Sequence, residues 1–407
     1  DWTQALTVAM RRLVDALGPR IDAVAGAALA SQGPGFVLVA ADGTLLTQTS
    51  PTWQDERCLP QGRWLFERVQ SHWPGIGGPF TNFPSKLRWA QENQPEAVAR
   101  ARWAMGIKDY LLFWLTGEVV TEPTSGSGGP DWHRNVFEVM GWPIDRLPRI
   151  AAPTEGIGTI RPAIARAMGL PRPLPIVIGL NDGGAATLAT GALDLGDVIA
   201  TLSTNGVYRV IMSEAVSTDI RLGHNLFNWP YLPPDRWIAG GQTKAGASAL
   251  QWFSEAAGGP EPVGIDRLLA EAAEVGPGSD GVVFLPYLMG RGSPRSDIAQ
   301  TGTFTGMRLS TRRGALARAV VEGVAFALRE IQEDFAGFGH PPQPIRLSGG
   351  GGRSPLWRQI LADMLGQPLT YHASDSTLGS AMLAAVGLGL HADIRTAAGT
   401  MSEAGLR

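Results

Sequence analysis

The sequence predicts an α/β protein, with helices covering the faces of a sheet. Short apolar segments typical of strands alternate along the chain with longer segments whose apolar residues recur at helical spacing. The 52 glycines and 30 prolines are spread along the 407 residues, which suits many short elements joined by turns. At roughly 150 residues per domain, this length predicts two domains or three.

The first half of the chain mixes helices and strands. Apolar side chains at positions 2, 6, 9, 10, 13, 14 and 17 predict an amphipathic helix over residues 2–17. Asp42-Gly43 marks a hairpin turn after an expected strand at residues 36–40. The other elements expected here are a strand at 23–29, helices at 86–93, 95–103 and 108–115, and a Ser/Thr/Gly-rich loop at 121–129.

Three prolines within residues 171–175 mark the predicted domain boundary, because such a run cannot continue a helix. We therefore expect one domain over residues 1–173 and a second over residues 174–407. Strands of the second domain are expected at 176–179, 198–202, 207–212, 237–239, 282–285, 345–347 and 369–371. Its helices are expected at 185–192, 245–253, 316–335, 355–365 and 378–388.

Charge and composition exclude several classes of protein. The 34 basic and 37 acidic residues leave no basic excess for a phosphate backbone, so no nucleic-acid partner is expected. No apolar run reaches the roughly 18 residues of a membrane span, and the start of the chain lacks the pattern of a signal peptide. The single cysteine, Cys58, cannot form an internal disulfide, which fits a reducing compartment. The expected location is therefore the cytoplasm.

Several common catalytic signatures are absent from the sequence. It contains no P-loop, no G-x-S-x-G elbow and no H-E-x-x-H motif. The six histidines are scattered, so the sequence identifies no metal ligands.

The first positive signal is Asp182, which follows an apolar strand and precedes Gly183-Gly184 and a small-residue helix. Ligands of open α/β sheets bind beyond the carboxyl ends of the strands, and a carboxylate there can accept a proton from a hydroxyl group. The same pattern also suits an aspartate that only caps the helix. The motif alone leaves both interpretations open.

Three glycine-containing segments of the second half are candidates for phosphate or nucleotide contact. Residues 203–206, Ser-Thr-Asn-Gly, form an expected hairpin tip whose hydroxyls and amides suit an anion, although an ordinary tight turn has the same composition. Residues 241–246 precede an expected helix and suit either phosphate contact or a plain cap. Residues 348–354, Ser-Gly-Gly-Gly-Gly-Arg-Ser, join a strand to a helix. The entropic cost of four glycines favours close approach of a flat ligand, or phosphate at the helix N-terminus, over a flexible loop.

A fifth segment, Trp53-Gln-Asp-Glu-Arg57, lies downstream of Gln32. A tryptophan beside amide, carboxylate and guanidinium groups is typical of a carbohydrate site, where the sugar stacks on the ring. A solvated charged turn with a half-buried tryptophan has the same composition, so both interpretations remain open.

In this order, these segments resemble the FGGY carbohydrate kinases, and within them the xylulokinase-like sugar and polyol kinases. The segments Phe284–Gly290, Ala317–Phe326 and Pro355–Asp363 extend the resemblance over almost the whole chain. It implies two actin-like (ribonuclease H-like) domains with an interdomain cleft, an N-terminal sugar-binding domain and a C-terminal nucleotide-binding domain. The implied reaction transfers the γ-phosphoryl group of ATP, with Mg²⁺, to a hydroxyl of a small ketose or polyol.

The resemblance assigns roles to individual residues. Asp182 matches the general base and also a contact to the substrate. The positions that match contacts to the nucleotide are Ser203, Thr204, Gly206, Gly246, Gly350, Gly351 and Ser354. The positions that match the sugar-facing region are Gln32, Trp53, Asp55 and Phe83. The implied partner is a small sugar or polyol, without nucleic acid or membrane, and the resemblance leaves a homodimer open.

Some positions depart from the family pattern. The family's first strand, with its Asp-x-Gly-Thr turn, and its closing helix have no counterpart between Asp1 and Arg407, so we expect a first domain incomplete at its N-terminus. The usual Gln-Met-His run reads Gln32-Gly33-Pro34, and Arg291 stands where an acidic residue is usual. The alternative is therefore a truncated or non-catalytic relative that binds nucleotide or sugar without turnover. A chaperone-type actin-like ATPase is disfavoured by residues 53–57.

Overall fold

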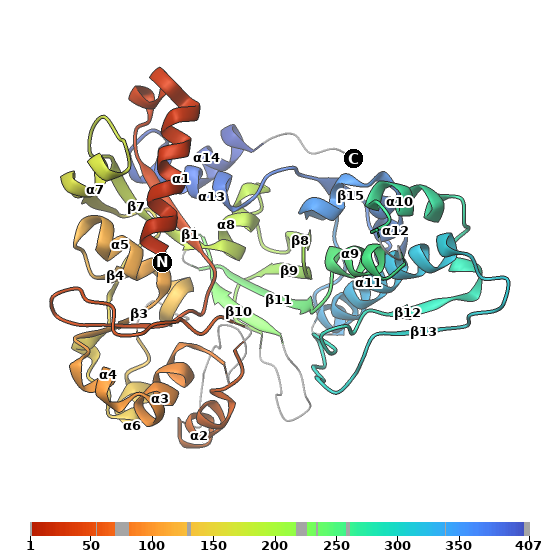
Figure 1. The fold of residues 1–407 in the computed structure, drawn as a ribbon, viewed down its shortest axis with the longest axis horizontal. Coiled ribbons are helices and arrows are strands. Elements are labelled where there is room, and N and C mark those ends of the chain that lie inside the picture. Colours follow the sequence, from red (N-terminus) through yellow and green to blue (C-terminus); the bar gives the residue numbers. More distant parts are fainter. Residues whose placement is uncertain are drawn as a thin grey trace. The chain divides into compact units, whose positions relative to one another are not determined.

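The computed structural model describes residues 2–53, 55–69, 81–127, 132–216, 226–232, 235–257, 261–337 and 339–402 (Figure 1). The chain forms two compact units, each described by itself below. Unit 1 comprises the described residues of Asp1–Gly191, Asn228–Asp235 and Ser376–Ser402. Unit 2 comprises those of Ala192–Phe227 and Arg236–Asp375.

A three-stranded sheet lies at the centre of unit 1, in the order β1 (Ala27–Ser31), β7 (Pro175–Asn181), β6 (Gly156–Thr159). β1 and β7 run parallel, and β6 runs antiparallel to β7. The register of β1 against β7 shifts between Ala28 and Leu29. Gly179 permits this irregularity, because its φ is +82° and a Cβ there would lie 2.0 Å from the Leu29 carbonyl oxygen.

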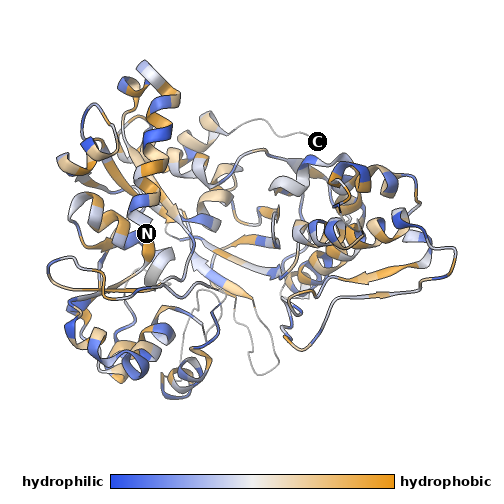
Figure 2. Cartoon of the chain, viewed as in Figure 1, coloured by the Kyte–Doolittle hydropathy of each residue, from blue (hydrophilic) through white to orange (hydrophobic). Residues whose placement is uncertain are grey.

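Helices cover this sheet. The predicted N-terminal helix is confirmed as α1 (Trp2–Leu17), along which Figure 2 shows polar and apolar residues alternating. Its apolar side packs with the core that Ile176 and Ile178 of β7 form. α8 (Asp182–Ala189) packs against α13 (Ser376–Gly387), where a Cβ at Gly379 would lie 1.9 Å from the Ala185 carbonyl oxygen. The remaining helices near this sheet are α5 (Ile107–Thr116), α7 (Pro162–Ala167) and α14 (Ile394–Met401).

The rest of unit 1 forms a separate core around Phe36, Leu87 and Phe137. The Asp42-Gly43 hairpin is confirmed: β2 (Val37–Val39) is followed by a turn in which Gly43 has φ +87°. The predicted helix at 95–103 is too long, because α4 ends at Arg100 and the next segment is β3 (Trp103–Met105), which pairs with β2. The other elements are α2 (Leu59–Val69), α3 (Phe83–Asn93), α6 (Arg134–Met140), β4 (Val120–Thr121) and β5 (Arg149–Ile150).

Five strands of a six-stranded sheet lie in unit 2, in the order β11 (Trp237–Thr243), β9 (Gly206–Met212), β8 (Val198–Leu202), β14 (Ile345–Ser348), β15 (Leu369–Tyr371). The hairpin predicted between residues 198 and 212 is confirmed as the antiparallel pair β8–β9. β8, β14 and β15 run parallel. β10 (Phe227–Pro230) precedes β11 along the chain.

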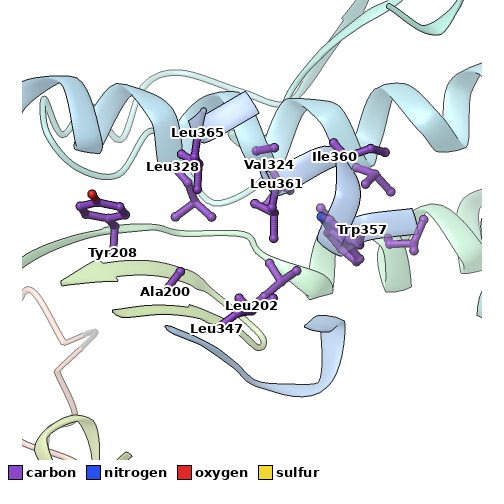
Figure 3. Packing of buried hydrophobic residues seen from close by; sticks show 14 of the residues in the cluster. Ala200, Leu202, Tyr208, Val324, Leu328, Leu347, Trp357, Ile360, Leu361 and Leu365 are labelled. Carbon is purple, nitrogen blue, oxygen red and sulfur yellow. The ribbon is translucent and has the colours of Figure 1, made fainter. Parts of the chain in front are cut away.

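Two long helices cover a face of this sheet. Figure 3 shows Leu202 and Leu347 on the strands below Val324 and Leu328 of α11 (Arg313–Gly337) and Leu361 of α12 (Pro355–Leu365). α9 (Ala247–Ala257), α10 (Ile265–Ala273) and the hairpin of β12 (Val283–Leu285) and β13 (Thr303–Thr305) complete the unit. The apolar core of unit 2 therefore lies between these helices and the sheet.

The two compact units do not divide the chain at residue 173, because unit 1 also contains residues from later in the sequence. β7 and α8 pack in unit 1 beside β1, and α13 returns to the same unit from near the end of the chain. The division into residues 1–173 and 174–407 stays a prediction about the family's domains. None of the helices in the described ranges is long and apolar enough to cross a membrane.

Candidate active site

The parallel pairing of β1 and β7 brings two predicted site residues to one edge of the unit 1 sheet. Ser31, the last residue of β1, lies opposite Asn181, the last residue of β7. The next residues, Gln32 and Asp182, therefore leave neighbouring strands at their carboxyl ends, and both are exposed. This is the edge at which parallel sheets bind their ligands.

Asp182 starts α8, but Asn181 caps it. The Asn181 Oδ1 atom accepts a hydrogen bond from the Gly184 amide at 2.5 Å. The Asp182 carboxylate instead accepts from the adjacent Gly183 amide at 2.8 Å. The capping role that offered an alternative interpretation of Asp182 thus belongs largely to Asn181.

A buried lysine joins the two segments that carry the predicted sugar-facing residues. The Lys86 ammonium donates to the carbonyl oxygens of Pro34 at 2.6 Å and of Thr52 at 2.9 Å. The first carbonyl lies two residues after Gln32, and the second directly precedes Trp53. Burial lowers the pKa of Lys86 to about 8.

Asp55 is already paired within its own loop. Both of its carboxylate oxygens accept from the Arg57 guanidinium, the shortest distance being 2.6 Å, and this contact lowers the pKa of Asp55. Arg57 in turn lies over the Trp89 ring, 4.8 Å from its centroid. Next in the chain, burial raises the pKa of Cys58 to about 11.

The remaining sugar-facing predictions have different surroundings. Trp53 is half-buried, and Gln54 of the same motif lies outside the described residues. Phe83 is 1% exposed and packs edge-on against Phe36, with ring centroids 5.7 Å apart. Phe83 therefore packs in the core beneath this region, and a contact to a sugar stays a prediction.

The sequence reasoning missed a polar layer under the same edge. Lys108 and Glu122 form a buried ion pair, and Thr124 joins it to the end of β7. Asp109, also buried, accepts from the Gly106 amide, and burial raises its pKa to about 6. Their signal in the sequence is weak: charged residues in a segment, 107–125, that is otherwise apolar or small.

In unit 2, the parallel pair β8–β14 brings two of the predicted nucleotide segments together. Ser348 lies opposite Thr201, and their hydroxyl oxygens are 3.1 Å apart. The turn at 203–206 and the glycine run at 349–352 therefore leave the sheet side by side. Ser203, Thr204 and Gly350 are exposed at this edge.

The third segment contacts the same turn. The amides of Gly246 and Ala247 donate to the carbonyl oxygens of Thr204 and Ser203, each at 2.7 Å. A Cβ at Gly246 would lie 2.3 Å from the Asn205 carbonyl carbon, so only glycine fits. Gly246 thus has a packing role in this turn whether or not it also contacts a nucleotide.

The four glycines of the 349–352 run differ in their surroundings. Gly349 has φ +92°, and a Cβ there would lie 2.5 Å from the Leu202 carbonyl oxygen. A Cβ at Gly351 would meet the Leu202 side chain at 2.6 Å, whereas none of the described atoms lies within 4 Å of a Cβ at Gly350. After the run, the Ser354 hydroxyl caps α12 by accepting from the Trp357 amide at 3.2 Å.

No metal-binding cluster is apparent in the ranges that the structure describes, where no three His, Cys, Asp or Glu side chains are grouped to hold an ion. Mg²⁺ often binds through one or two carboxylates together with substrate phosphates, so such a cluster is not required for a metal–nucleotide complex.

Comparison with known proteins supports the resemblance to carbohydrate kinases that the sequence shows. Residues 1–189 match the model of the N-terminal domain of the FGGY family of carbohydrate kinases, and residues 210–388 match that of its C-terminal domain. The xylulose kinase of Escherichia coli is 30% identical over 95% of this chain and 80% of its own length. A gluconokinase of Bacillus subtilis is 29% identical over 82% of this chain and 68% of its own length.

A solved structure of a xylulose kinase from Lactobacillus acidophilus has the same fold, with a TM-score of 0.84 at 24% identity, over 99% of this chain and 83% of that one. The fold is thus the two-domain actin-like fold of sugar kinases, which transfer a phosphoryl group to an alcohol. The chain belongs to the FGGY family of carbohydrate kinases.

Proposed function

We propose that the chain is an ATP-dependent kinase of a small, neutral ketose or polyol, with Asp182 as the general base. The observation that carries the proposal is the exposed carboxylate of Asp182 at the carboxyl end of β7, held by the Gly183 amide and adjacent to the strand end that carries Gln32. A carboxylate in this position can take the proton of the attacking hydroxyl. Mg²⁺ would accompany ATP and offset the charge on the phosphates.

The nucleotide would be held by unit 2. The exposed turn of Ser203 and Thr204 offers hydroxyls and backbone amides to phosphate oxygens. The adjacent Gly350 offers an open backbone surface to a flat base. Gly246 lies against the backbone of Asn205, and Gly351 lies against the Leu202 side chain, so both keep this surface compact. Gly206 begins β9 next to the turn, and Ser354 ends the surface by capping α12.

The acceptor would be neutral rather than acidic. The relatives include both xylulose kinases and gluconokinases, and a carboxylate-bearing acceptor needs a free cation nearby. In the described part of the Trp53 segment, Arg57 is paired with Asp55, and Lys86, which holds this segment, is buried against two carbonyl groups. This arrangement favours hydroxyl-bearing acceptors such as xylulose.

The first test measures ADP release from the full chain with ATP, Mg²⁺ and a panel of pentuloses, alditols and gluconate. We expect substrate-dependent turnover, and a loss of about 10²–10⁴ in kcat for Asp182→Asn with nucleotide binding retained. Asp42→Asn is the matched control, because Asp42 is also exposed and accepts a nearby amide, from Thr44. Full turnover by Asp182→Asn would contradict the base assignment.

The alternative, a relative that binds without turnover, gives a different result in the same experiment. It predicts a thermal shift with ATP but no ADP release with any acceptor of the panel. ATP hydrolysis that is indifferent to every sugar would instead support an actin-like ATPase.

A further inference from the structure

A relay of buried polar groups ends at the strand that carries Asp182. Its first link is the ion pair of Lys108, on α5, with Glu122, between β4 and the turn that follows it. The Nζ–Oε1 distance is 2.6 Å, and the side chains are 2% and 0% exposed. Such a pair is held by its hydrogen bonds, since burial of two charges is costly without them.

The carboxylate of Glu122 is the hub of the relay. Besides Lys108, it accepts from the Thr124 hydroxyl at 2.8 Å, from the Thr124 amide at 2.6 Å and from the Ser125 hydroxyl. A hydroxyl has a single proton to donate, and here Thr124 donates it to Glu122. The lone pairs of the Thr124 oxygen are therefore directed to another donor.

That donor is the backbone of the candidate catalytic turn. The Asn181 amide donates to the Thr124 hydroxyl oxygen at 3.1 Å, across 57 residues of sequence. The Asn181 side chain meanwhile caps α8 through the Gly184 amide. The residue immediately before Asp182 is thus fixed on both sides, by its backbone to the relay and by its side chain to the helix.

We propose that Thr124, oriented by the Lys108–Glu122 pair, is a positioning residue for Asp182. The inference rests on the proposed function, in which Asp182 is the base. Displacement of a catalytic group by about 1 Å can cost roughly 10² in rate, so a hydrogen bond that fixes its backbone acts on kcat. Thr124 and Asp182 are both in unit 1, so the relay needs no contribution from unit 2.

The test compares Thr124→Val, which keeps the shape but removes the hydroxyl, with Thr124→Ser, which keeps the hydroxyl. We expect kcat to fall by about 10- to 100-fold in Thr124→Val with the KM for ATP unchanged, and to stay within about threefold in Thr124→Ser. Ser125→Ala is the matched control, because Ser125 also donates to Glu122 but has no hydrogen bond to Asn181. It should lose stability comparably and keep its kcat.

A double-mutant cycle separates positioning from general damage. If Thr124 acts through Asp182, then Thr124→Val should lower kcat no further in an Asp182→Asn background. Equal rate losses in both backgrounds, or full kcat in Thr124→Val while Asp182→Asn is impaired, would overturn the positioning role alone. Full activity of Asp182→Asn itself would overturn the proposed function. Thermal melting of each variant identifies any that does not fold, and Thr124→Ala then replaces Thr124→Val in the same cycle.

Discussion

The strand edge of unit 1 and the strand edge of unit 2 are built in opposite ways. In unit 1, polar side chains fix the edge in place: Lys86 joins two loops, and a buried ion pair supports the end of β7. In unit 2, close packing of the backbone fixes the edge. Gly246 and Gly349 allow main-chain atoms to approach within distances that a Cβ would prevent. The difference suits the two proposed ligands. A sugar would be recognised by directed hydrogen bonds from side chains, and a nucleotide by backbone amides and by the open backbone surface at Gly350.

The largest expected effect tests whether unit 1 depends on its buried charges. Lys108→Met leaves the Glu122 carboxylate buried without its cation, and we expect a loss of about 3–5 kcal/mol in the free energy of unfolding. The double variant Lys108→Met/Glu122→Leu should recover part of that loss, because neither charge then remains. Urea unfolding measures both.

The control for this prediction is the exposed pair Arg149–Glu155, also in unit 1, with an N–O distance of 2.7 Å. Arg149→Met should cost less than about 1 kcal/mol, because exposed pairs contribute little. If Lys108→Met and Arg149→Met lower the free energy of unfolding by the same amount, the buried pair is not what stabilises this edge.

The second expected effect tests whether unit 2 depends on its glycines. A Cβ at Gly246 would meet backbone atoms of residues 205 and 206 at 2.3–2.4 Å, so Gly246→Ala should cost about 1–3 kcal/mol or more. Gly350→Ala meets no described atom within 4 Å and should stay within about 0.5 kcal/mol.

Gly350→Ala nevertheless separates folding from binding. The proposed nucleotide would lie against this residue, so we expect its KM for ATP to rise about tenfold while the KM for the sugar stays unchanged. Gly264→Ala is the control, because no described atom lies within 4 Å of a Cβ at Gly264 and its φ is not positive. Gly141→Ala is unsuitable, because Gly141 has a positive φ. An unchanged KM for ATP in Gly350→Ala would remove this residue from the nucleotide site.

The contrast also explains what the sequence could predict. Glycine runs between apolar strands are visible in one stretch of sequence, and the segments at 203–206, 246 and 349–352 lie together as a result of the β8–β14 pairing and the docking of α9. The unit 1 relay joins single polar residues, and its longest hydrogen bond links residues 57 positions apart in the sequence. None of these residues carries a local signal. Only the fold brings them together.

One helix prediction is wrong for a physical reason, and the assignment of Phe83 to the sugar side stays a prediction. Residues 101–103 continue a helical pattern, but pairing of β3 with β2 ends the helix, since a strand partner outweighs local propensity. Phe83 follows a pattern that the resemblance assigns to the sugar side, yet packing against Phe36 buries it. Sequence alone does not show which aromatic residue is covered.

The third expected effect returns to unit 1 and concerns binding rather than catalysis. Lys86→Met removes the donor that joins the Pro34 and Thr52 carbonyls, so the Gln32 and Trp53 segments lose their common anchor. We expect the KM for the sugar to rise about tenfold, which is ~1.4 kcal/mol, with the KM for ATP unchanged. This result mirrors that of Gly350→Ala. Arg63→Met, on the exposed face of α2, is the control for loss of a positive charge in the same unit.

The pKa of Lys86 supplies a second measurement. Native Lys86 loses its proton near pH 8, whereas the unfolded chain holds it to the ordinary value of 10.5. Between these values the unfolded state binds more protons, so the free energy of unfolding of the parent chain should rise with pH relative to Lys86→Met. The pKa of Cys58 is raised from 9.0 to about 11, so above about pH 9 this thiol makes the free energy of unfolding fall with pH. Both the parent chain and Lys86→Met contain Cys58, so its own contribution largely cancels in the difference between them. A difference that stays flat from pH 7.5 to 10.5 would show that Lys86 is not buried as a charged donor, and the sugar-side anchor would then need another residue.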